Sequence, residues 1–273
     1  MPFNLVCPSS RGLSLALSRR LLQTSPYPLV ATARKDTDAV KSSILEGLDV
    51  DENRVTVLKV DVTGLLFDPL DQGEHLANTQ HQDESLLSDA ASEISKRFPK
   101  DHIQYAFSTC GILHPERSPA DLKKELIMET LYTNILGPLL VLKHFSPFLP
   151  TKKTSSGSDA PSVWSNMAAR VGSTADNRLG GWYSYRATKA GVNSITKTFD
   201  IHLSRVSGDK AFCVSLHPGT VKTELSREFW GSVNNDKLFS PERAAERLVG
   251  VVSGLKLDQR GLFWDWEGKK IEW

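Results

Sequence analysis

Short apolar runs that suit β-strands alternate along this chain with longer stretches whose apolar residues recur at helical spacing. The strand-like runs are residues 3–6, 29–33, 54–60, 103–107, 162–167, 211–216 and 262–265. The helical stretches are residues 13–21, 38–45, 86–98, 120–144, the segment from Tyr185 onward, and 241–255 with Ser240 as its N-cap. This alternation predicts an α/β fold with a doubly wound parallel sheet, a Rossmann fold, whose ligands bind at the carboxyl ends of the strands.

Length and composition favour a single domain spanning residues 1–273. Hydrophobic residues make up 40% of the chain and charged residues 24%, which is enough apolar material for one sizeable core. No internal repeat or second core is evident. Residues 64–82 are polar and irregular and suggest a surface insertion, and residues 151–161, rich in Lys, Ser and Gly, suggest a loop.

The charge balance argues against several classes of partner. The chain has 33 basic and 32 acidic residues, so no broad attraction to nucleic acid or to an anionic membrane is expected. No apolar run reaches eighteen residues, so we expect no transmembrane span. Cys7, Cys110 and Cys213 are odd in number and far apart, which predicts unpaired thiols in a reducing compartment. The seven histidines lack metal-ligand spacing, so no structural metal is expected.

The first 34 residues contain four arginines, and the first acidic residue is Asp36. Such a composition is typical of a mitochondrial transit segment. The run that begins at Phe3 already suits a core strand, however, and a cleavable presequence would discard it. We therefore expect a cytoplasmic protein, with a mitochondrial one as the alternative.

Tyr185 and Lys189 are four residues apart, so on a helix they share one face about one turn apart. A fixed ammonium beside a phenol favours the phenolate and lowers the pKa of the phenol toward the neutral range. The pair can therefore serve as an acid or base for a carbonyl or an alcohol. The alternative is that both side chains only solvate an exposed helix face.

The Tyr185/Lys189 pair, the Pro218-Gly219 turn, Asp61-Val62 after the third strand and Asn134 in the long helix occur in an order that resembles the short-chain dehydrogenase/reductase family. The resemblance covers essentially the whole chain. It is strongest to small carbonyl-reductase-like and C-factor-like members, which end in an aromatic strand and a Gly-Lys turn, here residues 263–269. It implies a hydride-transferring oxidoreductase.

In that family the tyrosine donates a proton, the lysine lowers its pKa and holds the nicotinamide ribose, and the asparagine anchors a water that relays protons. The resemblance implies these roles for Tyr185, Lys189 and Asn134. Asn134 has an alternative as a polar residue inside a helix that bends before Gly137-Pro138.

The family's phosphate loop, TGxxxGxG, corresponds to residues 7–14, CPSSRGLS, and only Gly12 is kept. The loop must bring backbone N–H groups at a helix N-terminus close to a pyrophosphate. Pro8 removes one N–H, and Ser14 adds a side chain where helix packing is usually close. Hydroxyl and guanidinium donors could compensate. The expected loop contacts are Ser9, Ser10, Arg11, Gly12 and Leu13.

The second strand ends at Arg34, where NAD-specific members usually place an acid. Arg11 and Arg34 together would suit a 2′-phosphate, so the resemblance implies NADP, with NAD still possible. The alternative is two solvated surface arginines. The family's NNAG segment is residues 108–111 here, without its amides. The further cofactor contacts that the resemblance implies are Asp61, Val62, Gly111, Pro218, Gly219, Val221 and Thr223, besides Tyr185 and Lys189.

The family's catalytic serine lies three residues before a glycine, and with Gly172 as that glycine its position is Ala169. Alanine cannot hydrogen-bond a substrate oxygen, and losing one such donor typically costs about a hundred- to a thousandfold in rate. Ser165 or Ser173 could replace it only if the loop is shifted.

Two hypotheses of different classes therefore stay open. The first is an NADP(H)-dependent enzyme that reduces a ketone or aldehyde, or oxidises the alcohol; the second is a nucleotide-binding sensor or scaffold that no longer catalyses. We favour the enzyme because a chain released from catalysis has no evident reason to retain the Tyr/Lys spacing. Residues 224–239, with Phe229 and Trp230, suggest a lid over an apolar substrate. The resemblance also implies a homodimer or homotetramer formed through the Asn134 and Tyr185 helices.

Overall fold

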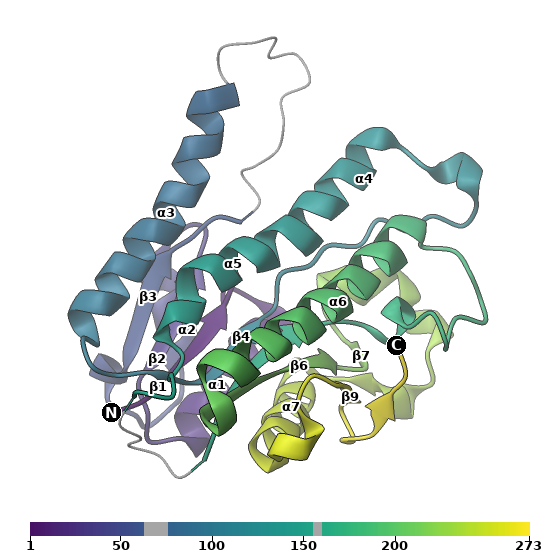
Figure 1. Cartoon of the computed structure of the whole chain (residues 1–273). Helices are drawn as coiled ribbons and strands as arrows, with labels where there is room; N and C mark the ends of the chain where they lie inside the picture. The colour runs from purple at the N-terminus through teal and green to yellow at the C-terminus, as the bar shows by residue number, and fades with distance from the viewer. Residues whose placement is uncertain (63–75, 155–159) are drawn as a thin grey trace.

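The computed structural model describes residues 1–62, 76–154 and 160–273. Eight strands form one sheet in the order β10-β9-β6-β5-β4-β1-β2-β3, and every neighbouring pair is parallel except β9 and β10. The strands are β1 Phe3–Cys7, β2 Leu29–Ala33, β3 Val55–Lys59, β4 Ile103–Ser108, β5 Ser162–Met167, β6 Ala211–His217, β9 Phe263–Asp265 and β10 Lys270–Ile271. The predicted doubly wound α/β fold is confirmed (Figure 1).

Helices cover both faces of this sheet. Helices α1 (Gly12–Thr24), α2 (Thr37–Leu45) and α7 (Pro241–Gly254) pack on one face, where their apolar residues share a core cluster with those of the strands. Helices α3 (Leu76–Arg97), α5 (Gly137–Phe145) and α6 (Tyr183–Val206) pack on the other (Figure 1). The Ser240 hydroxyl accepts a hydrogen bond from the Arg243 N–H at 3.2 Å, so the predicted N-cap of α7 is confirmed.

The seven predicted strands all lie in the sheet, but the predicted last strand does not close it. After β9 the chain turns back, and β10 pairs antiparallel with β9 as the edge strand. β10 has only two residues, which is too short for an alternating pattern to be recognised. The first strand lies in the middle of the sheet, between β4 and β2.

The predicted insertion at residues 64–82 is partly wrong. Residues 63–75 lie outside the described part of the chain, but α3 begins at Leu76 and so starts ten residues before the predicted helix. Leu87, Ala90 and Ile94 give this helix its buried face, as predicted. In the predicted loop at 151–161, residues 155–159 also lie outside the described part, and the rest has no helix or strand.

The predicted loop at residues 224–239 is also wrong in detail. It contains the 3₁₀-helices η7 (Glu224–Ser232) and η8 (Asn235–Lys237) and then β8 (Leu238–Phe239). β8 pairs with β7 (Thr220–Val221) in a small parallel sheet separate from the main one. Both strands have only two residues, which is too short for an alternating pattern to be recognised in the sequence. Their pairing fixes both ends of the segment that carries Phe229 and Trp230.

The long helical region predicted at 120–144 is interrupted. It consists of α4 (Lys124–Leu131), a π-helical turn η3 (Tyr132–Leu136) and α5, followed by a short 3₁₀-turn. Among the described residues, the stretch Lys124–Phe148 is the one helix whose length and composition would allow it to cross a membrane. Its α5 part contributes Val141 and Phe145 to the core under the sheet.

Candidate active site

The predicted site residues lie after the carboxyl ends of β1, β2, β3, β4 and β6, in the π-turn η3, and on helix α6. The loops after β1 and β6 touch: a Cβ added at Gly12 would lie 3.0 Å from the Thr223 Cγ2. Gly12 also has a positive φ of 55°, which only glycine adopts readily. The phosphate loop and the loop after β6 are therefore brought together, as expected for two walls of one cofactor site.

Tyr185 and Lys189 lie on the first two turns of α6 and are both buried. Lys189 is 2% exposed, and its Nζ lies 5.7 Å from the centroid of the Tyr185 ring. The ammonium donates to the Met167 carbonyl at 2.9 Å and to the Cys110 carbonyl at 3.4 Å. The alternative of a solvated helix face is thus wrong, because both side chains are directed into the protein.

The pKa of Tyr185 differs from the sequence expectation. Burial raises the pKa of the Tyr185 phenol, and burial lowers the pKa of Lys189 to about 8, an effect that the Cys110 thiol partly offsets. The expected lowering of the Tyr185 pKa is not seen. The reason is that burial removes the phenol from water.

Asn134 lies in the π-turn and is fully buried. Its Oδ1 accepts from the Ile112 N–H at 2.8 Å, and its Nδ2 donates to the Ile112 carbonyl at 3.0 Å and to the Thr188 Oγ1 at 3.1 Å. Asn134 therefore joins the loop after β4 to helix α6, one residue away from Lys189. The π-turn directs its amide inward, and such turns often occur at functional sites.

Gly111 brings these groups to one point. A Cβ added at Gly111 would lie 3.1 Å from the Lys189 Nζ and 3.9 Å from the Asn134 Oδ1. Any larger residue would press on the lysine. The retained glycine of the altered 108–111 segment is thus explained by its close approach to Lys189.

In the phosphate loop, Ser10 and Arg11 are accessible to a ligand, whereas Ser9 is buried and already hydrogen-bonded within the protein. The buried Ser9 hydroxyl donates to the Val6 carbonyl at 2.7 Å, and the Ser9 N–H donates to the Thr32 carbonyl at 2.8 Å. Ser10 and Arg11 are exposed, and no side chain caps the N-terminus of α1. The uncapped N–H groups of this helix are the type of donor that binds phosphate.

Thr109 and Ser14 replace the strand-to-strand support that the missing amides would give. The Thr109 N–H donates to the Cys7 carbonyl at 2.8 Å, and its hydroxyl donates to the Pro8 carbonyl at 3.0 Å. The Ser14 hydroxyl lies 3.0 Å from the Thr109 hydroxyl. Thr109 and Ser14 both depart from the family pattern, and their contacts link the loop after β4 to the loop after β1 and to the first turn of α1.

Arg34, Asp61 and Val62, the residues predicted to contact the adenosine part of the cofactor, lie at the same carboxyl edge of the sheet. Arg34 follows β2 and is exposed, and Asp61 and Val62 follow β3. Val62 is buried, and its Cβ would lie 3.4 Å from a Cβ added at Gly137. Val62 thus packs on the first turn of α5.

The Pro218–Thr223 segment is shaped by Gly219. This glycine has a φ of 76°, and an added Cβ would lie 2.7 Å from the Phe239 ring and 3.1 Å from the Trp266 ring. Val221 is buried in β7 against β8. The turn after β6 is therefore held by aromatic side chains from β8 and from the turn after β9.

Ala169 lies two residues after the end of β5, in an extended conformation with φ −151° and ψ 148°, and precedes a 3₁₀-turn, η5 (Arg170–Gly172). Both proposed substitute serines are buried. Ser165 is fully buried within β5, and the buried Ser173 hydroxyl accepts from the Asp176 N–H at 3.0 Å. Burial therefore keeps both hydroxyls away from solvent.

Gly172 presses directly on the helix that carries the Tyr/Lys pair. A Cβ added there would lie 2.6 Å from the Lys189 carbonyl carbon and 2.9 Å from the Ala190 nitrogen. We expect Gly172→Ala to lower the free energy of unfolding by about 1–3 kcal/mol, because backbone atoms cannot give way. Gly250 is an exposed position of α7, and nothing lies within 4 Å of a Cβ added there. Gly250→Ala should therefore raise the free energy of unfolding by about 0.5–1 kcal/mol. Urea unfolding measures both; a Gly172→Ala protein as stable as the parent would contradict the packing of η5 on α6.

The sequence reasoning missed Trp182. Its ring meets the Tyr185 ring edge-on at 6.1 Å and packs on the Phe229 ring at 4.7 Å. It therefore links the Tyr185 helix to the segment predicted as a lid. The sequence signal for this contact was the position of the tryptophan, three residues before Tyr185.

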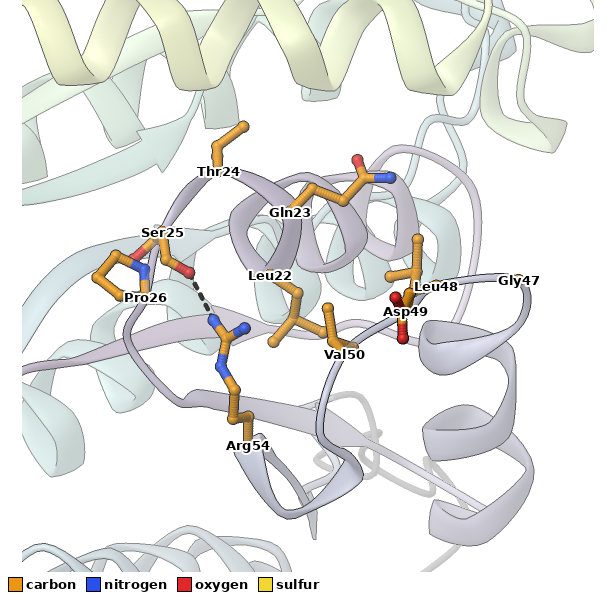
Figure 2. Close-up of a pocket in the computed structure, with 10 residues that line it drawn as sticks. All are labelled: Leu22, Gln23, Thr24, Ser25, Pro26, Gly47, Leu48, Asp49, Val50 and Arg54. Atoms are coloured by element: carbon orange, nitrogen blue, oxygen red, sulfur yellow. Dashed lines mark hydrogen bonds between the residues drawn. The ribbon is translucent and has the colours of Figure 1, made fainter.

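A separate pocket of about 540 Å³ lies between the end of α1 and the segment that leads into β3 (Figure 2). Arg54 reaches across it to the Ser25 and Tyr27 carbonyls. These residues lie at the amino ends of β2 and β3, so this pocket is at the opposite edge of the sheet from the predicted site. Elsewhere, the described residues contain no group of three His, Cys, Asp or Glu side chains that could hold a metal ion, and all three cysteines are free and buried.

Comparisons with known proteins agree with this fold, although no family model matches the chain. The 1-hydroxy-2-glutathionyl-2-methyl-3-butene dehydrogenase of Rhodococcus is 27% identical over 270 residues, which cover 98% of each chain. The C-signal protein of Myxococcus xanthus is 30% identical over 144 residues, 53% of this chain and 76% of that protein. The NADPH-bound carbonyl reductase from chicken fatty liver has the same fold, with a TM-score of 0.78 and 23% identity over the whole of both chains.

The order of the strands, the helix that carries Tyr185 and Lys189, and these relatives all lead to one assignment. The chain belongs to the short-chain dehydrogenase/reductase family of oxidoreductases.

Proposed function

We propose that the protein is an NADP(H)-dependent oxidoreductase that reduces a ketone or aldehyde, or oxidises the corresponding alcohol, with Tyr185 as acid and base. The observation that carries this proposal is the convergence of Gly111, Asn134 and Lys189 beside Tyr185. Four residues from three separate segments meet there, and Tyr185 and Lys189 carry the side chains that can transfer a proton.

The residues present fit a dinucleotide. The uncapped N-terminus of α1 suits the pyrophosphate, with Ser10 and Arg11 exposed beside it. Gly12 and Gly111 allow the loops after β1 and β4 to lie close to Thr223 and Lys189, which gathers these loops around one site. Arg11 and Arg34 supply the positive charge that a 2′-phosphate requires, and the chicken liver carbonyl reductase was solved with NADPH.

When bound, the nicotinamide supplies or accepts the hydride. Tyr185, kept protonated at neutral pH by burial, donates its proton to the oxygen of the reduced carbonyl. Lys189, whose pKa is about 8, is largely protonated at neutral pH and can return a proton to the phenol. Asn134 holds the Ile112 main chain and Thr188, which keeps the loop after β4 in contact with α6.

A specific observation supports a second candidate function, a nucleotide-binding sensor or scaffold. Ala169 offers no hydroxyl to a substrate oxygen, and Ser165 and Ser173 are both buried elsewhere. We rank this candidate second because the Tyr185/Lys189/Asn134 contacts are all intact. In either case we infer an apolar ligand, because the Trp182 ring stands beside Tyr185 and packs in turn on the Phe229 ring.

We also infer that the arginine-rich start belongs to the fold of a cytoplasmic protein. Cleavage after Arg34 would remove β1 and β2 from the middle of the sheet. A homodimer or homotetramer is inferred from partly exposed apolar side chains on α4, α5 and α6, namely Met128, Leu131, Leu139 and Ile201.

The proposal is tested by titrating the protein with NADPH and NADH while following tryptophan fluorescence, and by measuring turnover of a panel of ketones and aldehydes. Arg34→Ala should weaken NADPH binding about tenfold and leave NADH binding unchanged, because only NADPH carries the phosphate. Arg205→Ala, an exposed cation in the last turn of α6, is the control.

Tight NADPH binding with turnover would support the enzyme, and binding without turnover across the panel would favour the sensor. Failure to bind either nucleotide would contradict both. Equal losses for the two nucleotides in Arg34→Ala would show that Arg34 does not recognise the 2′-phosphate.

A further inference from the structure

Glu116 is a buried carboxylate that the chemistry above does not use. It lies in the loop after β4 and is 3% exposed. Its Oε2 accepts from the Ser184 N–H at 2.8 Å, and its main-chain carbonyl accepts from the Trp182 N–H at 2.6 Å. Glu116 thus makes two hydrogen bonds to the residues that immediately precede Tyr185.

Helix α6 needs such a partner because its own N-cap residue cannot serve. Trp182 occupies the N-cap position with a left-handed φ of 52°, and no local side chain caps the helix. The first N–H groups of a helix require acceptors, and Ser, Thr, Asp or Asn usually supplies one at the N-cap itself. Here a carboxylate from another loop accepts the Ser184 N–H, where the positive end of the helix dipole also favours its charge.

The turn before α6 is held from two sides. Gly180, Gly181 and Trp182 all have left-handed φ values between 52° and 65°. The Arg186 guanidinium donates to the Gly180 carbonyl at 2.9 Å and to the Gly181 carbonyl at 2.9 Å. Glu116 holds the same turn through the Trp182 N–H. Trp182, the one non-glycine residue of the three, is therefore kept in a conformation that tryptophan alone disfavours.

This turn controls where the Tyr185 ring lies. Trp182 contacts the Tyr185 ring and the Phe229 ring, and Ser184 is the residue directly before Tyr185. A shift of the Ser184 N–H would move the tyrosine along with the first turn of the helix. Misplacing a reacting group by about 1 Å can cost roughly a hundredfold in rate.

We propose that Glu116 is a positioning residue for the reaction: it caps α6 from outside the helix and thereby sets the Tyr185 hydroxyl against the substrate. This inference rests on the proposed function, since it assigns Tyr185 the role of proton donor. The cap itself is a structural statement that can be tested without turnover.

Glu116→Ala, Glu116→Gln and Glu116→Asp separate the contributions. Glu116→Ala removes the acceptor and should lower kcat about ten- to a hundredfold, with the NADPH affinity unchanged. Glu116→Gln keeps an amide oxygen for the Ser184 N–H and should restore most of kcat. Glu116→Asp keeps the charge on a shorter side chain and should fall between the two.

Asp121→Asn is the matched control. The Asp121 carboxylate accepts from the Arg117 and Ser118 N–H groups in the same loop but does not contact α6 in the described structure. This variant should leave kcat unchanged. Amide hydrogen exchange is measured on every variant, and the Ser184 N–H should exchange faster in Glu116→Ala but not in Glu116→Gln or Asp121→Asn.

The two readouts keep the inference distinct from the proposed function. If the parent protein turns over no substrate, the proposed function fails, and the exchange of the Ser184 N–H still decides the cap. Unchanged exchange and unchanged kcat in Glu116→Ala would overturn the inference. So would equal losses of kcat in Glu116→Ala and Glu116→Gln, because the second variant retains the acceptor. If Glu116→Ala does not fold, Glu116→Asp takes its place in both comparisons.

Discussion

Replacing Tyr185 with phenylalanine should lower kcat for carbonyl reduction about a hundred- to ten-thousandfold, the range that one general acid contributes. The phenol is the titratable group on the face of α6 that also presents Lys189, and burial keeps it protonated at neutral pH. Phenylalanine keeps the ring contact with Trp182 and removes only the hydroxyl. NADPH affinity should therefore stay nearly unchanged.

Tyr183→Phe is the matched control for this variant. Tyr183 begins the same helix but is 42% exposed, so loss of its hydroxyl should leave kcat as it is. Steady-state kinetics and NADPH titration of both variants decide the matter. Unchanged turnover in Tyr185→Phe would remove Tyr185 from the mechanism.

Replacing Ala169 with serine should raise kcat about a hundred- to a thousandfold, the value of one donor to a developing oxyanion. Ala169 lies two residues after the end of β5 and immediately before η5, which packs on α6 through Gly172. A hydroxyl added at Ala169 would thus join the site at the position that the family uses. Stability and NADPH affinity should change little.

Ala168→Ser provides the comparison, because Ala168 is buried in a small cluster with Val192 and Phe263. A hydroxyl there would be surrounded by apolar groups and should give no gain in kcat. If Ala169→Ser also gives no gain in kcat, another group already stabilises the substrate oxygen, and the side chains around Trp182 are the next candidates.

The main sheet was predictable because most of its strands are short runs dominated by apolar residues. Residues 29–33 and 162–167 are buried at every position, and the sequence places both strands at their observed bounds. β7, β8 and β10 have two residues each and leave no periodic signal. The early start of α3 was hidden because residues 76–85 are polar and lack an apolar stripe.

The site was predictable at positions where only one residue type fits. Gly12, Gly111 and Gly219 are needed because a Cβ would meet a neighbour, and the sequence retains them. The Thr109–Ser14 contact joins residues 95 positions apart, and the Glu116–Ser184 contact spans 68. Such pairs depend on how the loops fold over the sheet, which no local pattern encodes.

The direction of the Tyr185 pKa was also beyond the sequence. Spacing alone places an ammonium near a phenol, and the expected result is a lowered pKa. The fold adds burial of the phenol, and this burial reverses the result.

The π-turn at Tyr132–Leu136 makes this part of the chain sensitive to residue count. A π-turn contains one residue more than an α-helical turn, so deleting one residue there would restore a regular helix. Because the π-turn takes up that extra residue, α5 would keep nearly its present orientation after the deletion. Val141 and Phe145 would stay in the core, whereas Asn134, inside the turn, would change direction and lose Ile112. In the descent of such sequences, a one-residue deletion at this turn could therefore remove the buried amide while leaving the packing of α5 intact.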